Sequence, residues 1–255
     1  MPAVSLQTLS DRIAALLRVA EIPDYAGAMN GLQLENASGE VVRLLAAVDA
    51  SLPVMAAAAA RPGPSLLLVH HGLFWKGAQR VTGAQFRKLR AALEGGLAVY
   101  SAHLPLDVHP RLGNNALLAA ALGLGETVPF FDWKGLPLGL RAQVDLSREV
   151  LRERLAAAVG GPVHLCPGGP ERVREVGLIT GGAGSEASAV AAAGVDTFIT
   201  GEGPHWSYPA AEEAGINLFY GGHYATETFG VKALAAELGA AFGLPWEFID
   251  HPTGL

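Results

Sequence analysis

Histidine side chains follow an apolar segment of this 255-residue chain at a point where a strand would end. The run from Leu66 to Val69 leads directly into His70, His71 and Gly72. Two imidazoles are costly to bury unless a partner takes up their lone pairs, and a metal ion is the usual reason for such a pair to converge. Adjacent strand residues point to opposite faces, so both rings reach one site only if the chain turns, which Gly72 permits. Taken alone, the pair favours a metal site no more than a capped loop.

Two later segments repeat this arrangement with a carboxylate added. His103 and Asp107 follow one apolar run, and His223 and Glu227 follow another. A carboxylate supplies the hard oxygen ligand that complements imidazole nitrogen. If a helix begins near residue 224, His223 and Glu227 share one face a turn apart; alternatively, Glu227 only complements the dipole of that helix. In a protein with eight histidines, three such strand ends together predict a metal site, and bridging carboxylates favour two ions.

Other common catalytic motifs are missing from the sequence. It has no G-x-x-x-x-G-K-[ST] phosphate loop and no G-x-S-x-G nucleophile elbow. The glycine-rich stretch 181–185 lacks the spacing of a dinucleotide site. Cys166 follows His164 by two residues in a loop where nothing nearby would orient a nucleophile pair. If two divalent ions are bound by the histidines and carboxylates, they could activate water while nearby side chains move protons, which is metal-assisted hydrolysis.

Short apolar strands alternate with alanine-rich helical segments, and this pattern has to position those side chains. The expected strands cover residues 44–48, 65–69, 97–102, 173–179, 197–200 and 217–220. The expected helices cover residues 51–60, 82–94, 185–193, 209–214 and 225–238. We therefore predict an α/β fold with two interlocked lobes and mostly parallel sheets flanked by helices. A metal cleft between the lobes is what the family resemblance given below implies.

The segment Thr127 to Ala142 interrupts the alternation, because it is rich in proline, glycine and aromatic residues. We take it as the start of a second lobe. Lobe 1 is predicted to comprise residues 1–126 together with 220–255 and to carry most of the metal ligands. Lobe 2 is predicted to comprise residues 127–219 and to complete the cleft.

Composition narrows the class of protein. The net charge of −6 argues against nucleic acid or an anionic membrane surface as the main partner, because either requires a basic face. A single cysteine excludes an internal disulfide and a thiolate cluster. The first residues show neither a signal peptide nor a membrane anchor, so we expect a cytoplasmic protein.

Six stretches closely resemble the NIF-three-like dinuclear metal-centre family, also labelled GTP cyclohydrolase type 1 type 2 homolog. They occur in the family's order and span nearly the whole chain, which is similar to the short bacterial form without an inserted domain. The stretches are 28–33 (AMNGLQ), 70–75 (HHGLFW), 101–107 (SAHLPLD), 113–115 (GNN), 200–202 (TGE) and 221–227 (GGHYATE).

The resemblance implies a complete set of site residues. The implied metal ligands are His70, His71, Asp107, His223 and Glu227, of which Asp107 and Glu227 would bridge two divalent ions. Zinc, iron, manganese, cobalt and nickel are not distinguished by mixed nitrogen and oxygen ligands. His103 falls where the family also has histidine, and we expect it to be a substrate contact or proton shuttle. Glu202 matches the family's Thr-Gly-Glu, although the loop after it departs from the family pattern. We expect Glu202 as a second catalytic group, with His205 as the alternative proton-moving residue.

The resemblance also implies a ring-shaped homohexamer acting on a small-molecule substrate, for which a nucleotide is one option. Two function classes stay open. One is a metal-dependent, cyclohydrolase-like hydrolase; the other is a non-catalytic metal storage, delivery or regulatory protein that uses the same ligands. A third reading, histidines as structural caps in a nucleotide-binding domain, is weakened by the missing phosphate loop.

Three further residue types have simple structural interpretations. Asp49 is expected to cap the helix that follows it, the alternative being that it orients an imidazole. Asn114 and Asn115 are expected to hold the loop 103–107 through hydrogen bonds to backbone. Trp75 is expected to wall the site.

Overall fold

The structure, a computed structural model, describes residues 3–255 and confirms the predicted α/β fold class. Its main sheets have five and six strands and are both mixed, and a short ladder joins β1 (Val4–Ser5) to β3 (Glu40–Val41). The chain divides into two compact units. Unit 1 runs up to Leu106 and includes Gly230–His251, and unit 2 comprises Asp107–Phe229 with Pro252–Leu255.

The sheet of unit 1 has the strand order β13-β4-β5-β6-β2. Its strands are β13 (Trp246–Phe248), β4 (Arg43–Asp49), β5 (Ser65–His71), β6 (Leu97–Ser101) and β2 (Gly31–Leu34). The first four run parallel and β2 is antiparallel to β6. Because parallel strands end at the same edge of a sheet, the residues after β4, β5 and β6 are brought together there.

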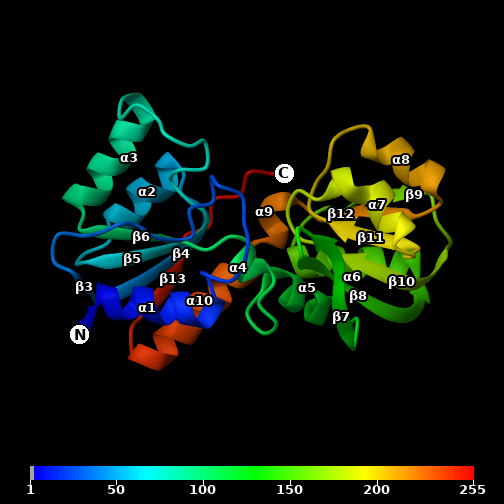
Figure 1. Ribbon diagram of the computed structural model, residues 1–255, viewed down its shortest axis with the longest axis horizontal. Coiled ribbons are helices and arrows are strands. Elements are labelled where there is room, and N and C mark those ends of the chain that lie inside the picture. Colours follow the sequence, from blue (N-terminus) through cyan, green and yellow to red (C-terminus); the bar gives the residue numbers. More distant parts are fainter. Residues whose placement is uncertain (1–2) are drawn as a thin grey trace. The chain divides into compact units, whose positions relative to one another are not determined.

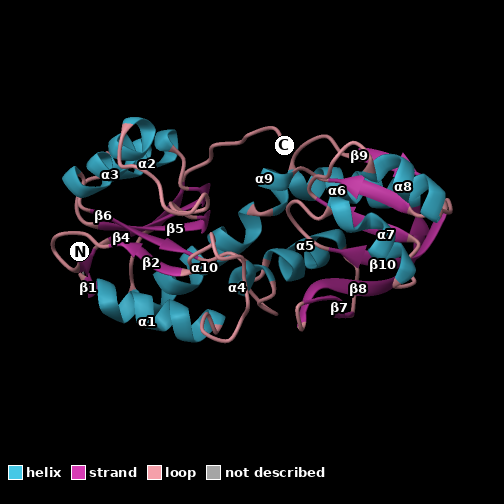
Figure 2. Ribbon diagram, turned by 45° about the horizontal axis from the view of Figure 1, so that its top comes forward, coloured by secondary structure: helices cyan, strands magenta, loops and turns pink. Residues whose placement is uncertain are grey.

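Helices cover both faces of this sheet (Figures 1 and 2). Helices α2 (Leu52–Ala59) and α3 (Gly83–Glu94) lie on one face, and α1 (Leu6–Leu17) and α10 (Thr228–Phe242) lie on the other. Helix α1 shows why: its buried residues Leu6, Leu9, Ile13 and Leu17 recur every three or four positions and form one apolar stripe. Burying that stripe against the sheet stabilises the helix more than its own propensity does.

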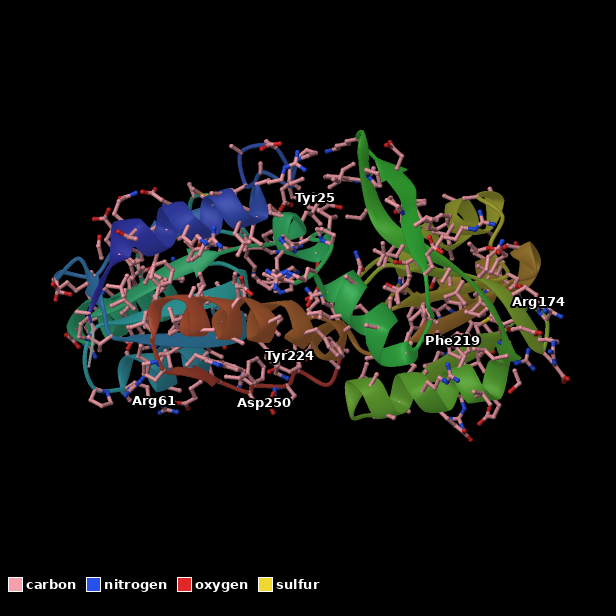
Figure 3. The ribbon with its side chains drawn as sticks, turned by 90° about the horizontal axis from the view of Figure 1, so that it is seen from below. Tyr25, Arg61, Arg174, Phe219, Tyr224 and Asp250 are labelled. Carbon is pink, nitrogen blue, oxygen red and sulfur yellow. The ribbon has the colours of Figure 1, made fainter. Side chains whose placement is uncertain are left out.

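Unit 2 is built around the strand order β7-β8-β10-β11-β12-β9. Its strands are β7 (Thr127–Trp133), β8 (Leu136–Ser147), β10 (Arg172–Leu178), β11 (Thr197–Thr200), β12 (Asn217–Tyr220) and β9 (His164–Pro167). Strands β10, β11 and β12 are parallel, and the outer strands are antiparallel to their neighbours. Phe219, labelled in Figure 3, is fully buried in one of the two cores of this unit.

The two faces of this sheet carry different helices. Helices α5 (Asn114–Leu122) and α6 (Arg148–Val159) pack on one face, where Leu118 and Leu155 are buried with Phe219. Helices α7 (Ala187–Ala192) and α8 (Ser207–Ala214) pack on the other, around Phe198. A one-turn 3-10 helix, η1 (Gly184–Glu186), precedes α7.

The division of the chain differs from the one expected from composition. The segment taken as the start of lobe 2 forms β7 and the first half of β8, an antiparallel hairpin whose second strand pairs with β10. Residues 107–126, expected in lobe 1, belong to unit 2, because α5 packs in the same core as α6. Unit 2 also extends past residue 219, to Phe229. An edge hairpin tolerates proline and glycine, so its composition resembles that of a linker.

Two short helices lie close to the units' boundaries. Helix α4 (Leu104–Asp107) follows β6, and α9 (His223–Thr226) follows β12. The helix expected over 225–238 is therefore two helices, because Glu227 leaves helical geometry between α9 and α10. No helix within residues 3–255 is long and apolar enough to cross a membrane.

Candidate metal centre

Three imidazoles converge in unit 1. His70 and His71 are the last two residues of β5, and His103 lies between β6 and α4. The ring centroids of His70 and His103 are 4.8 Å apart, and those of His70 and His71 are 4.9 Å apart. One ligating nitrogen of each residue lies within 4.8 Å of the others, a spacing that could hold a metal ion. His70 and His71 are adjacent, yet both rings reach this cluster because the strand ends at His71 and the chain turns at Gly72.

Every imidazole of this cluster has its Nδ1 atom at hydrogen-bond distance from an oxygen. The pairs are His70 with the Ala102 carbonyl at 2.9 Å, His71 with Asp49 Oδ1 at 2.8 Å, and His103 with Asp24 Oδ1 at 2.8 Å. Carbonyl and carboxylate oxygens accept hydrogen bonds, so each neutral ring carries its proton on Nδ1 and its lone pair on Nε2. This is the usual way in which a protein fixes the tautomer of a metal-ligating histidine.

The structure does not place Asp49 at the helix cap that was expected of it. Composition favours it as a helix cap, yet Ser51 takes that position at α2, where its hydroxyl accepts the Val54 N–H. Asp49 instead faces His71 across the β4–β5 register. The alternative role, orienting an imidazole, is the one that the structure supports.

Asp24 is a site residue that sequence reasoning missed. Besides the contact with His103, its Oδ2 accepts hydrogen bonds from Asn30 Nδ2 at 2.8 Å and from the Leu104 N–H at 2.9 Å. Burial alone would raise the pKa of Asp24, but His103, Asn30 and the Tyr25 N–H together hold that pKa below its ordinary value. Only the neighbouring motif at 28–33 could have drawn attention to this segment.

Gln33 ties together the two loops next to the cluster. Its Nε2 donates to the carbonyls of Ala28 and Met29 at 3.1 and 3.0 Å, and its Oε1 accepts the Leu73 N–H at 2.7 Å. A Cβ at Gly72 would lie 2.4 Å from the Gln33 amide, so any other residue there would have to displace that side chain. The turn predicted at Gly72 is therefore held by a side chain from the strand β2.

Two aromatic side chains flank the imidazoles. The Trp75 ring meets His103 edge-on at a centroid distance of 4.7 Å and lies 5.6 Å from His71. Tyr25, which projects from the loop after α1 (Figure 3), lies 6.1 Å from His103. Both aromatic side chains are partly exposed, so they form a wall beside the cluster rather than part of the core, as expected for Trp75.

Unit 2 holds the second imidazole–carboxylate group. His223 begins α9, and its Nε2 lies 3.2 Å from Glu227 Oε2, so the two residues share one face as their spacing predicts. His223 Nδ1 lies 2.8 Å from Glu202 Oε1. Burial alone would lower the pKa of His223, but Glu227 and Glu202 raise it to about 9. Glu202, predicted as a catalytic group, is thus placed where it orients and charges His223.

The glycine-rich stretch 181–185 packs against this group. A Cβ at Gly181 would lie 2.2 Å from Glu227 Oε1, and a Cβ at Gly182 would lie 3.3 Å from the His223 ring. The Gly181 N–H donates to Thr226 Oγ1 at 3.1 Å, which fixes the loop on α9. Glycine here lets the backbone approach a carboxylate and an imidazole closely.

Asp107 lies in a hydrogen-bonded network of unit 2. Its Oδ1 accepts from Asn114 Nδ2 at 2.7 Å and from Thr180 Oγ1 at 3.4 Å, and Asn115 Oδ1 accepts the Thr180 N–H at 2.9 Å. Asn114, expected to bond backbone, thus binds the carboxylate itself. Asp107 is buried, and a network of this kind fixes its orientation.

The donor set fits divalent metal ions. Unit 1 offers three imidazoles with defined tautomers, and unit 2 offers His223 with the buried carboxylates Asp107 and Glu227. Buried carboxylates are costly without a compensating charge, which cations supply. Nitrogen and oxygen donors together suit zinc and the neighbouring transition metals.

The chain is similar to known proteins over nearly its whole length. A family model described as Duf34/NIF3 (NGG1p interacting factor 3) matches residues 4–253. A relative from Deinococcus radiodurans, described as "GTP cyclohydrolase 1 type 2 homolog", is 42% identical over 242 residues, which cover 94% of this chain and 90% of the relative. An Escherichia coli relative with the same description is 37% identical over 256 residues, covering 96% and 97%.

Solved structures agree with this relationship. The structure described as protein ybgI of unknown function has a TM-score of 0.90 at 35% identity, covering 99% of this chain and 100% of that one. A crystal structure of a Thermus thermophilus protein has a TM-score of 0.88 at 39% identity with the same coverage. Reduced HcgD from Methanocaldococcus jannaschii, at a TM-score of 0.86 and 24% identity, covers 98% of this chain and 100% of that one and shares the fold.

Proposed function

Because the chain belongs to the Duf34/NIF3 family, we propose that it is a metal-dependent hydrolase that holds two divalent ions per subunit. The observation that carries this proposal is the convergence of imidazoles whose Nδ1 atoms all contact an oxygen acceptor. Three of these imidazoles, those of His70, His71 and His223, are proposed ligands, and a metal-ligating imidazole usually has its other ring nitrogen bonded to an oxygen in this way. The fourth, His103, is held in the same manner beside them.

The proposed ligands are drawn from both units: His70, His71, Asp107, His223 and Glu227. If these residues hold one pair of ions, Asp107 and Glu227 would be the carboxylates shared between them. The chain passes between the units at Leu106–Asp107 and again at Phe229–Gly230. Asp107 lies at the first of these two points in the sequence, and Glu227 lies within three residues of the second. These positions support the proposal that both carboxylates act together with the imidazoles of unit 1.

The chain's own residues then have defined tasks. Bound ions would supply Lewis acidity and lower the pKa of water toward neutrality. His103, with its Nδ1 held by Asp24, would accept or return a proton at Nε2. Glu202 would hold His223 through Nδ1 rather than act on substrate. Trp75 and Tyr25 would limit water access beside the imidazoles.

The substrate is proposed to be a small molecule, and a nucleotide is the first candidate. Relatives described as GTP cyclohydrolase homologs support testing the hydrolytic opening of a purine ring. A ring-shaped homohexamer and a cytoplasmic location are further parts of this proposal. The homohexamer rests on the family resemblance, and the cytoplasmic location rests on the single cysteine, which suits a reducing compartment.

Metal analysis tests the proposed centre. We expect about two divalent ions per chain in the purified protein, and Asp107→Ala and His223→Ala should each lose at least one, because each removes a ligand. Glu126→Ala, at an exposed carboxylate of unit 2, is the matched control and should keep the full metal content. Normal metal content in both ligand variants would refute the metal centre.

Turnover separates the hydrolase from a metal storage or delivery protein. The metal-loaded protein is incubated with GTP, and ring-opened product or released formate is measured against a control without enzyme. His103→Gln should abolish turnover while metal content stays intact, since His103 is not among the proposed ligands. Product equal to the no-enzyme control would remove the cyclohydrolase activity and leave the metal-binding alternative.

A further inference from the structure

A buried carboxylate in the loop between α1 and β2 acts on the candidate site from outside the proposed ligand set. We propose that Asp24 is a positioning residue: it holds the His103 imidazole through Nδ1 and so keeps the Nε2 lone pair available to the imidazole cluster. The catalytic consequence of this inference rests on the proposed function. The positioning itself does not, because it concerns only residues of unit 1.

Asp24 holds both the ring and the backbone of the same segment. Its Oδ1 contacts His103 Nδ1 at 2.8 Å, and its Oδ2 accepts the Leu104 N–H at 2.9 Å. Asn30 adds a second connection, since its Nδ2 donates to Asp24 at 2.8 Å and its Oδ1 accepts the His103 N–H at 2.7 Å. The imidazole therefore cannot rotate away without breaking bonds to a fixed backbone.

The pair formed by the Asp24 carboxylate and the His103 imidazole is shielded from water. The side chain of Asp24 is 7% exposed, whereas the side chains of Asp49 beside His71 and Glu202 beside His223 are 33% and 41% exposed. Water competes for exposed carboxylates and screens their charge, so a buried pair holds its geometry more strictly. Of these three carboxylates, Asp24 is the one best placed to determine a tautomer.

A neighbouring ring and the backbone also restrict the movement of the His103 imidazole and the Asp24 carboxylate. Trp75 packs edge-on against His103 at 4.7 Å, which restricts the plane of the imidazole. The Tyr25 N–H donates to Asp24 Oδ1 at 2.6 Å, so the carboxylate is itself fixed by backbone. A side chain held on this many sides is pre-organised, and pre-organised groups lose little entropy when they act.

The test uses nitrogen-15 NMR of the full-length protein, labelled at histidine and freed of metal with a chelator. Magic-angle spinning allows the measurement for an assembly of any size. Protonated and unprotonated ring nitrogens have well-separated resonances, and comparison with His103→Gln assigns those of His103. In the unchanged protein, at a pH where the ring is neutral, we expect the His103 proton on Nδ1. A proton on Nε2 would overturn the proposal without the need for any other variant.

Asp24→Asn is the decisive variant. Oδ2 accepts two donors, Leu104 N–H and Asn30 Nδ2, whereas Oδ1 accepts one backbone donor, the Tyr25 N–H. The amide oxygen should therefore occupy the Oδ2 position, and the amide nitrogen should face His103. The His103 proton should then move from Nδ1 to Nε2. Asp49→Asn is the matched control, because it should alter only the His71 resonances. An unchanged His103 spectrum in folded Asp24→Asn would refute the positioning role.

Kinetics adds a readout that a purely structural role would not produce. If the protein hydrolyses a substrate, Asp24→Asn should lower kcat about 10- to 100-fold while KM and metal content stay near those of the unchanged protein. The two proposals can fail separately. A shifted tautomer without any hydrolysis upholds the positioning role and removes the hydrolase, whereas an unshifted tautomer removes only the positioning role.

Discussion

Protonation decides whether the side chains of the candidate centre can bind a cation. His223 lies between Glu227 and Glu202, and their charges raise its pKa to about 9 although burial opposes this. The metal-free protein therefore carries an imidazolium at this position near neutral pH. A metal ion requires the neutral ring, so binding at His223 has to displace a proton.

This pKa predicts how the stability of the metal-free protein depends on pH. The folded pKa of His223 lies above its ordinary value of 6.5, so its stabilising contribution is complete below pH 6.5 and is lost as the pH rises through about 9. The loss amounts to about 1.4 kcal/mol for each unit of the shift. Denaturant unfolding between these pH values should show it, and His223→Gln should flatten the dependence. An equally steep dependence in His223→Gln would refute the assignment.

At the scale of secondary structure, strand ends and one glycine loop build the site. Strands β4 and β5 place Asp49 directly opposite His71, so an imidazole and its carboxylate partner come from paired register positions. In unit 2, the loop after β10 brings Gly181 against Glu227 on the segment after β12. Parallel strands make both arrangements possible, because their ends share an edge.

The glycine loop predicts a specific loss of metal. Gly181→Ala would place a Cβ 2.2 Å from Glu227 Oε1, so the carboxylate must move and metal content should fall. Gly160→Ala is the matched control: its φ of +67° is close to the +74° of Gly181, but its Cβ would meet no described heavy atom within 4 Å. Both variants carry a backbone cost of roughly 1–2 kcal/mol, and only Gly181→Ala should lose metal. Equal metal content in the two would contradict the role of this loop.

At the scale of the whole molecule, the proposed ligands belong to two compact units that the chain joins more than once. His70 and His71 belong to unit 1, and Asp107, His223 and Glu227 belong to unit 2. If both sets serve the same ions, metal binding couples the stabilities of the two units. If each set binds its own ion, metal binding does not couple the two ligand sets.

A double-mutant cycle distinguishes these cases. At a metal concentration of about 100 times Kd, each bound ion should add about 2.7 kcal/mol to the free energy of unfolding. His70→Asn and Glu227→Gln should each remove most of this gain, and the double variant should lose little more, because one removed ligand already weakens the shared centre. The same variants in chelator provide the baseline. Strictly additive losses would indicate two independent sites.

The sequence by itself determined what depends on local pattern. Apolar periodicity predicted the strands at 43–49, 65–71 and 217–220 to within two residues of their observed ends and established the α/β class. The four-residue spacing of His223 and Glu227 predicted that their side chains meet, because residues four apart lie about one helical turn from each other. The structure shows this contact, although Glu227 itself lies just past the end of α9. The family resemblance added the remaining proposed ligands.

Only the tertiary structure decided which distant residues meet. Asp24 reaches His103 across 79 positions, and Glu202 reaches His223 across 21. The hairpin of β7 and β8 joins unit 2 through its pairing with β10, despite a composition that resembles a linker. Such contacts depend on strand order, on register and on where loops close, and no local run of residues encodes any of these. Spacing predicts neighbours along one element, whereas packing between elements selects the partners that orient them.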